Sequence, residues 1–150
     1  MPWTPLHSAA MHDGADTVRS LVADGADVRA HASEGWTPLL VALNNNNEEV
    51  AMALLDLGAN VDDQHTGDGK TALHFAVRDR LLTALVALIE RGANMEVRPA
   101  STGYAFSMLT PREWAVQKGD DEMVAVIDGA VARNRASSAC VCVCVCVCVC

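Results

Sequence analysis

Apolar and polar positions alternate along this chain in a pattern that recurs four times and predicts two short helices in each recurrence. Each unit starts at a threonine that is followed by a short stretch rich in alanine and leucine. A polar break comes next, and a second stretch then places larger apolar residues at helical spacing, as Leu82, Leu85 and Leu88 do. The threonines are Thr4, Thr37, Thr71 and Thr110, so the intervals between them are 33, 34 and 39 residues. A fixed period of this length is typical of repeat proteins, and the longer last interval indicates an insertion of roughly six residues.

Residues at both ends of the expected helices support this division. The threonine hydroxyl can cap the free backbone N–H groups at the start of each first helix. Thr110 and Glu113 also fit a capping box. Proline follows three of the threonines at the first helical position, where its missing N–H costs nothing: Pro5, Pro38 and Pro111. Three second helices should end at a glycine, which adopts the left-handed conformation at low cost: Gly25, Gly58 and Gly92.

With these features in register, the sequence resembles the ankyrin repeat. The motif T-P-L-H-x-A begins at Thr4 and returns in variant form, and the close G-A-D-V at Gly25 returns at Gly58 and Gly92. The resemblance covers roughly residues 3–130. It implies an all-α ankyrin-repeat solenoid of stacked helix-turn-helix units with projecting hairpin-like loops, called fingers. It also implies a concave surface made by the fingers and the first helices.

We therefore expect an ankyrin-repeat array over residues 1–132, with repeats at approximately 3–33, 34–66, 67–98 and 107–132, and a low-complexity tail over 133–150. Leu40 replaces the usual histidine of the second unit. Arg112 and Glu113 replace the usual Leu-His of the fourth, which is therefore degenerate. Terminal repeats are commonly atypical because their outer face meets water. The first finger is missing, which leaves open that the chain is a fragment of a longer array.

No recognisable catalytic, metal-binding or cofactor motif occurs before the tail, and we expect no enzymatic activity and no cofactor. His7 and His74 occupy the same place in the repeat, so we favour bracing of adjacent units by hydrogen bonds over catalysis or metal binding. The run from Gly67 to Thr71 is similar to the end of a phosphate-binding loop, but Gln64 stands where that motif needs glycine. An acidic loop lacks the ligand pattern of a calcium loop: Asp62, Asp63 and Asp68.

The charge and the cysteine content narrow the classes of partner and compartment. A formal net charge of −8 argues against a nucleic-acid partner, because phosphate binding needs clustered Lys and Arg. The acidity favours a basic partner or serves solubility alone. Residues 1–139 contain no cysteine, which indicates a reducing compartment, cytoplasmic or nuclear. No stretch of about 18 apolar residues occurs before the tail, so we expect no membrane span.

The expected function is that of a protein-protein interaction module or adaptor, which binds an unidentified protein through the fingers and the concave first-helix face. The candidate residues lie on the finger arms and at the ends of the first helices: Trp36, His12, Asn44, Asn45, Lys70, Arg78 and Asp79. Trp36 is either an exposed anchor or a ring packed on the next unit, whereas for Trp3 we favour packing. The alternative function, which stays open, is that of a regulatory ankyrin fragment of a larger protein, such as an enzyme or a channel, truncated by gene prediction.

Two further segments are candidates for binding. The long last finger, from Arg98 to Met108, contains Tyr104 and Phe106 and is either a binding loop or a neutral excursion. On the opposite side, Met52 and Val86 occupy second-helix positions that are usually polar in this family, and they predict a small apolar stripe on the convex face.

The tail alternates cysteine and valine from Cys140 to Cys150 and holds all six cysteines. As an extended strand it would place the thiols on one face. Soft-metal binding, β-aggregation and prenylation are the functional interpretations. We favour a genetic origin, since a translated TG dinucleotide repeat encodes Cys-Val without end.

Overall fold

The structure, a computed structural model, describes the backbone of residues 2–12, 14–99 and 109–145, and the side chains within these ranges as far as residue 133. These residues form eight α-helices and one 3-10 turn, η1 at Ser33–Gly35. The described residues contain no strand, only an isolated β-bridge between Gln64 and Thr71. The predicted all-α class is therefore confirmed. The helices are α1 Pro5–His12, α2 Ala15–Ala23, α3 Pro38–Asn44, α4 Glu48–Asp56, α5 Ala72–Asp79, α6 Leu82–Glu90, α7 Pro111–Lys118 and α8 Asp121–Val145.

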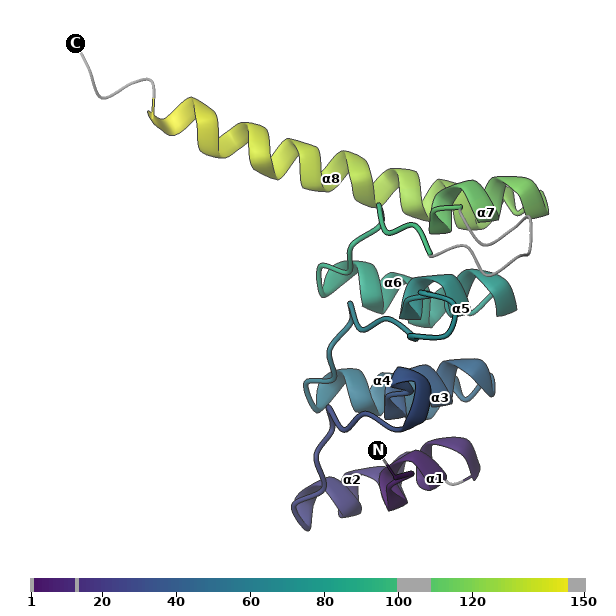
Figure 1. Cartoon of the computed structure of the whole chain (residues 1–150). Coiled ribbons are helices and arrows are strands. Elements are labelled where there is room, and N and C mark those ends of the chain that lie inside the picture. Colours follow the sequence, from purple (N-terminus) through teal and green to yellow (C-terminus); the bar gives the residue numbers. More distant parts are fainter. Residues whose placement is uncertain (1, 13, 100–108, 146–150) are drawn as a thin grey trace.

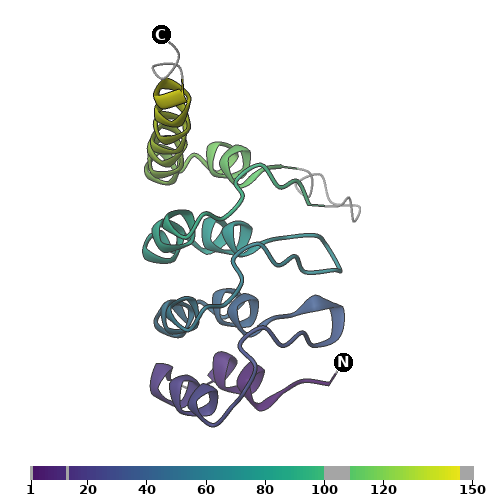
Figure 2. The ribbon, with the colours of Figure 1, turned by 90° about the vertical axis from the view of Figure 1, so that its left-hand side faces the viewer.

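The eight helices form four antiparallel pairs that stack into two layers (Figure 1). The first helices pack on one another in the order α1, α3, α5, α7, and the second helices in the order α2, α4, α6, α8. The loops between successive pairs project on the side of the first helices (Figure 2). We call them finger one (residues 24–37), finger two (57–71) and finger three (91–110, of which 100–108 lie outside the described residues). This is the solenoid that the sequence predicted.

Helix α8 continues past Ala132, where the sequence places the end of the array, and it includes Cys140 to Val145. Figure 1 shows it running beyond the stack. The backbone of this part of the Cys-Val tract is helical and not extended. The array boundary at residue 132 stays a prediction.

The predicted helix ends are confirmed. The Thr37 hydroxyl accepts a hydrogen bond from the Leu40 N–H, at 3.3 Å. Thr110 and Glu113 form the expected capping box, in which each side chain accepts from the backbone N–H of the other. Gly25, Gly58 and Gly92 have φ of 100°, 88° and 82°, and each follows the C-cap residue of a second helix. The next N–H then bonds to the carbonyl five residues back, as from Ala59 to Leu54, which satisfies a free carbonyl at the helix end.

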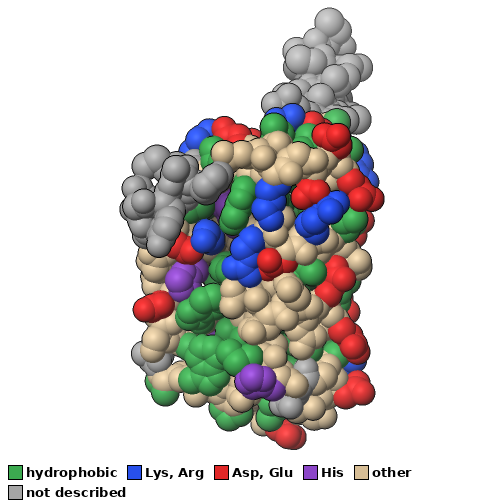
Figure 3. All heavy atoms as spheres, turned by 90° about the vertical axis from the view of Figure 1, so that its right-hand side faces the viewer, with side chains coloured by type: hydrophobic (Ala, Val, Ile, Leu, Met, Phe, Trp, Pro, Cys, Tyr) green, Lys and Arg blue, Asp and Glu red, His purple; other side chains and the backbone are tan. Residues whose placement is uncertain are grey.

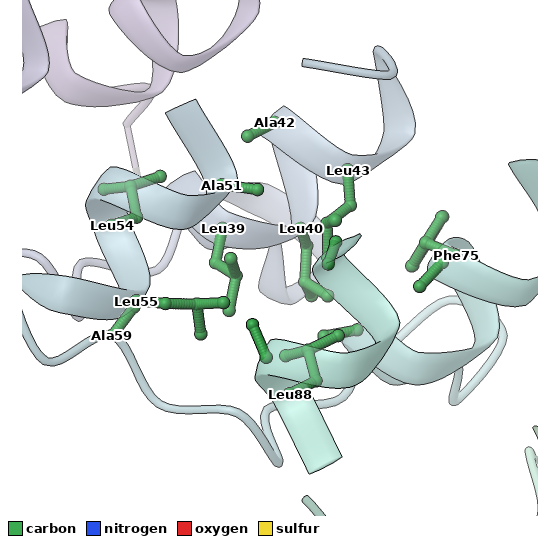
Figure 4. Close-up of a cluster of buried hydrophobic side chains, with 14 of the residues drawn as sticks. Leu39, Leu40, Ala42, Leu43, Ala51, Leu54, Leu55, Ala59, Phe75 and Leu88 are labelled. Atoms are coloured by element: carbon green, nitrogen blue, oxygen red, sulfur yellow. The ribbon is translucent and has the colours of Figure 1, made fainter. Parts of the chain in front are cut away.

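The core lies between the two layers and continues from unit to unit (Figure 4). Small residues at one position of the first helices are at most 1% exposed, so neighbouring helices approach closely: Ala9, Ala42, Ala76 and Ala115. Larger side chains such as Leu54 and Leu88 come from the second helices and are fully buried. Leu40, which stands where the family has histidine, is 1% exposed and contributes to this core. Units two and three are packed on both sides and therefore hold the largest share of the buried apolar side chains.

His7 and His74 brace adjacent units, which confirms the structural role that the sequence favoured. In His74, Nδ1 accepts from the Thr71 N–H at 3.2 Å, so the proton resides on Nε2, which donates to the Leu109 carbonyl of the fourth unit at 3.2 Å. His7 makes the same contacts with Thr4 and with the Trp36 carbonyl, the latter at 2.9 Å. Burial lowers the pKa of His74 to about 4, and burial likewise lowers the pKa of His7.

Candidate functional site

Four positions in each unit form the candidate binding surface, because the repeat places equivalent residues side by side along the stack. They lie one residue before each repeat threonine and four, seven and eight residues after it. The first of these positions is on a finger, and the others are on the first helix and at its end. We call the set the finger face. Its members are Trp3, Ser8, Met11 and His12; Trp36, Val41, Asn44 and Asn45; Lys70, Phe75, Arg78 and Asp79; and Leu109, Trp114, Gln117 and Lys118.

A shallow apolar hollow of about 230 Å³ opens on the finger face between units one and two. Figure 3 shows hydrophobic side chains gathered on this side of the molecule, toward the end of the stack that lies farthest from the C-terminal helix. The Trp3 side chain is 46% exposed, and its ring centroid lies 5.2 Å from that of His7. The packing that the sequence favoured for Trp3 therefore covers only part of the ring. The lining residues are Trp3, Met11, Trp36, Val41, Asn44 and Asn45.

Trp36 packs against neighbouring rings and also lines the hollow; its role as a binding anchor stays a prediction. Its ring centroid lies 4.4 Å from that of His65 on finger two and 5.8 Å from that of Phe75 in the third unit, so the ring packs on both. The residue is half-buried and also lines the hollow. It therefore presents an aromatic surface whose position is fixed by its neighbours. A pre-positioned ring loses little conformational entropy when a partner covers it.

Asn44, Arg78 and Asp79 form one network across the second and third units. The Arg78 Nε donates to both Asp79 carboxylate oxygens at 3.0 Å, and its Nη1 donates to the Asn44 Oδ1 at 3.1 Å. The guanidinium also lies 5.0 Å from the centroid of the Phe75 ring. Asn45 donates through Nδ2 to the Val41 carbonyl at 2.8 Å, which closes the end of α3. The structure thus brings five of the predicted site residues together beside the hollow: Trp36, Asn44, Asn45, Arg78 and Asp79.

Lys70 lies farther along the stack, on finger two. Its Nζ is 2.7 Å from the Asp68 Oδ2 and 5.8 Å from the centroid of the Trp114 ring in the fourth unit. Burial acts to raise the pKa of Asp68, but hydrogen bonds from Lys70 and His65 outweigh it and hold that pKa below its ordinary value. Asp68 therefore stays ionised and keeps the Lys70 ammonium in place above Trp114.

The remaining predicted elements are separate from this network or outside the described residues. His12 is the last residue of α1 and is exposed. Tyr104 and Phe106 of the long finger fall within residues 100–108, outside the described residues. Met52 and Val86 line a hollow of about 420 Å³ on the second-helix layer, together with Leu82 and Ala87. The predicted convex apolar stripe is therefore present.

Sequence reasoning missed eight residues of this surface: Ser8, Met11, Val41, Phe75, Leu109, Trp114, Gln117 and Lys118. Position within the repeat could have found them, since Met11 is equivalent to Asn44 and Arg78, and Lys118 is equivalent to Asn45 and Asp79. The Lys118 Nζ donates to the Arg78 carbonyl, which joins the fourth unit to the network.

The described residues contain neither a metal-binding cluster nor a membrane-spanning helix. No group of three or more His, Cys, Asp or Glu side chains among them could hold a metal ion. None of the described helices is both long and apolar enough to cross a membrane.

Known proteins are similar to this chain over most of its length. A family model of ankyrin repeats, in three copies, matches residues 6–99. A mitochondrial disaggregase from Bos taurus is 31% identical over 125 residues, which cover 83% of this chain and 18% of the relative. A B-cell lymphoma 3 protein homolog from Mus musculus is 35% identical over 127 residues, which cover 83% of this chain and 27% of the relative.

A third relative is ankyrin repeat and SOCS box protein 11 from Pongo abelii, which is 25% identical over 92% of this chain and 41% of its own length. The chain therefore spans well under half the length of these relatives.

Proposed function

Since the chain belongs to the ankyrin-repeat family, whose members are generally protein–protein interaction modules, we propose that it is a binding module or adaptor whose finger face receives another protein. The observation that carries the proposal is the continuity of this face. The hollow beside Trp36 passes directly into the Asn44–Arg78–Asp79 network, and Lys118 extends it to the fourth unit. Recognition then depends on a few central anchors surrounded by polar contacts.

The finger face suits recognition better than the convex hollow around Met52. Across the four units its positions carry aromatic, amide, cationic and anionic side chains, which can distinguish one partner from another. The convex hollow itself is lined mainly by apolar side chains, of which Met52, Leu82 and Ala87 also pack in or against the core. We therefore assign discrimination to the finger face.

A protein partner recovered with the full chain provides the test. Trp36→Ala and Trp3→Ala should each weaken binding, Trp36→Ala by at least tenfold, which corresponds to about 1.4 kcal/mol. Trp3→Ala is the safer variant for the fold, because that ring is 46% exposed. The matched control is the pair Met52→Lys and Val86→Lys, which changes the convex hollow and should leave the dissociation constant unchanged. Loss of binding in the control pair, with normal binding by both tryptophan variants, would place the partner on the convex face and reject the proposal.

The alternative, a regulatory ankyrin segment within a larger protein, draws support from the relatives, since this chain covers 18% of the disaggregase and 27% of the lymphoma protein homolog. Such a segment would use the same face to contact another domain of its own chain. Sequencing the full transcript upstream of Met1 and downstream of Cys150 separates the two proposals.

A further inference from the structure

The finger face changes character along the stack. In units one and two its positions hold apolar and uncharged polar side chains together with His12. In units three and four the same positions bring in Lys70, Arg78 and Lys118. Figure 3 shows this directly, with basic side chains gathered between the hydrophobic patch and the C-terminal end of the stack. A ligand that lies along the stack would therefore meet apolar surface first and positive charge next.

Four cations form the charged part: Lys70, Arg78 and Lys118 of the finger face, and Arg80, which follows Asp79 in the chain. Three of them each pair with a carboxylate of their own. Lys70 pairs with Asp68 at 2.7 Å, Arg78 with Asp79, and Arg80 with Asp120 at 2.9 Å. Lys118 pairs with no carboxylate among the described residues, and its Nζ donates to the Arg78 carbonyl. Four cations against three carboxylates leave this patch positive, although the whole chain has a net charge of −8.

Arg78 lies beside the hollow, and the four cations stay partly accessible. Arg78 bonds to Asn44, which itself lines the hollow, so the first positive charge is one residue away from the apolar surface. The side chain of Arg78 is 32% exposed and that of Arg80 is 62% exposed. The Arg78 guanidinium over Phe75 and the Lys70 ammonium over Trp114 are held in place by ring contacts. Fixed cations beside an apolar hollow suit a ligand that carries carboxylates beside a large apolar side chain.

We propose that the finger face binds an acidic, extended peptide segment of a partner protein, with one large apolar side chain of the peptide in the Trp3–Trp36 hollow and its carboxylates beside Arg78 and Lys118. This inference rests on the proposed function and specifies the partner. A hollow of about 230 Å³ is smaller than the roughly 300–1,000 Å³ of a small-molecule site and matches a single side chain. The local positive charge reverses the preference for a basic partner that the net charge alone suggests.

A protein ligand fits this charge distribution better than single-stranded nucleic acid does. Nucleic acid carries one phosphate per nucleotide and needs several unpaired cations in a row. Here only Lys118 lacks a carboxylate among the described residues, and the chain as a whole would repel a polyanion. An acidic peptide can place a carboxylate beside Lys118 and its apolar anchor in the hollow, and it carries fewer negative charges for the chain to repel.

The test is a selection from a phage-displayed library of random peptides of about twelve residues, which reach about 40 Å when extended. The full chain is the bait at about 0.15 M salt, where exposed charges act over about 8 Å. Enriched peptides should combine net negative charge with at least one large apolar residue. The strongest peptide is then synthesised and its dissociation constant is measured by fluorescence anisotropy, together with that of a thymidine oligonucleotide of similar length.

Matched variants locate the peptide. Trp3→Ala and the pair Arg78→Gln and Lys118→Gln should each weaken peptide binding about tenfold, and Lys118→Gln alone about threefold, since Lys118 is exposed and its loss leaves no carboxylate unpaired. Arg19→Gln removes an exposed cation from α2 and should have no effect.

Each outcome separates this inference from the proposed function. If the selected peptides are basic and the Trp3→Ala variant binds them more weakly, the acidic ligand is wrong but the finger face remains the binding surface. Peptides that respond only to Met52→Lys and Val86→Lys would overturn both. An oligonucleotide that binds more tightly than any selected peptide, or a library that yields no enriched peptide, would overturn the inference.

Discussion

The buried histidine that joins the third and fourth units makes the stability of the stack sensitive to acid. His74 is 0% exposed, and burial holds its pKa at about 4 against an ordinary value of 6.5. Below pH 6.5 the unfolded chain binds a proton on this residue, while the folded chain does not until the pH approaches 4. The free energy of unfolding is therefore fully retained above about pH 6.5 and falls as the pH is lowered through this window.

The size of the effect follows from the shift. A difference of about 2.5 pKa units, at about 1.4 kcal/mol for each, amounts to roughly 3 kcal/mol between pH 7 and pH 4. This is a large part of the total stability of a small domain, which is about 5–15 kcal/mol. The lowered pKa of His7 acts in the same direction, so the measurement must isolate His74.

Urea unfolding of the full chain and of His74→Leu, followed by circular dichroism at several pH values from 7 to 4, makes that separation. Leucine is the replacement that the chain itself uses at the equivalent position, Leu40. At pH 7 the variant should be less stable by about 1–3 kcal/mol, because it loses the bond to the Leu109 carbonyl and leaves the Thr71 N–H without its partner. Toward pH 4 the original chain should lose about 3 kcal/mol more stability than the variant, so the difference should vanish or reverse, and contributions from His7 cancel in the subtraction. A difference that stays constant across the window would show that His74 is not held neutral by burial.

Three further predictions concern other parts of the molecule. Thr110→Ala should lower the free energy of unfolding in urea by about 0.5–2 kcal/mol, because it removes half of the capping box with Glu113, and Thr110→Ser should be close to the original. Amide hydrogen exchange should be slowest in α3 to α6, since units two and three are packed on both sides; slower exchange in α1 or α7 would contradict this. Deleting residues 139–150 should leave the melting temperature in calorimetry nearly unchanged and improve solubility, whereas a large loss of stability, or stoichiometric zinc or copper bound by the tail, would refute its origin as a translated dinucleotide repeat.

Sequence could predict the helix ends and the braces because each depends on chemistry confined to one unit. Three local patterns each indicate one structural role: a threonine before proline, a glycine after a second helix, and a histidine three residues after a threonine. Each pattern also occurs in more than one unit, which strengthens the prediction. Left-handed residues in the helix–helix turns were less predictable. Asn46 and Arg80 have φ of 58° and 59°, and a polar break indicates a turn without saying which residue takes that conformation.

The binding surface could be predicted only in part because its contacts cross between units. The bond from Arg78 to Asn44 joins residues that are 34 positions apart. The hollow is lined by two residues of unit one and four residues of unit two. Net charge sums over all faces, so it could not reveal that the stack places several cations on one of them. Comparing equivalent repeat positions, instead of scanning for motifs, recovers most of this surface.

The brace formed by each histidine has a consequence for how such a chain can change over generations. Its acceptor is a backbone carbonyl, at Trp36 for His7 and at Leu109 for His74, and every residue type supplies one. For this brace, each unit needs from the unit that follows it only a correctly placed main chain, while the packed core adds side-chain contacts between units. This explains how the fourth unit stays attached despite Arg112 and Glu113 in its motif and despite the longer segment that precedes Leu109. Duplication, exchange or lengthening of units can thus proceed without loss of the histidine brace.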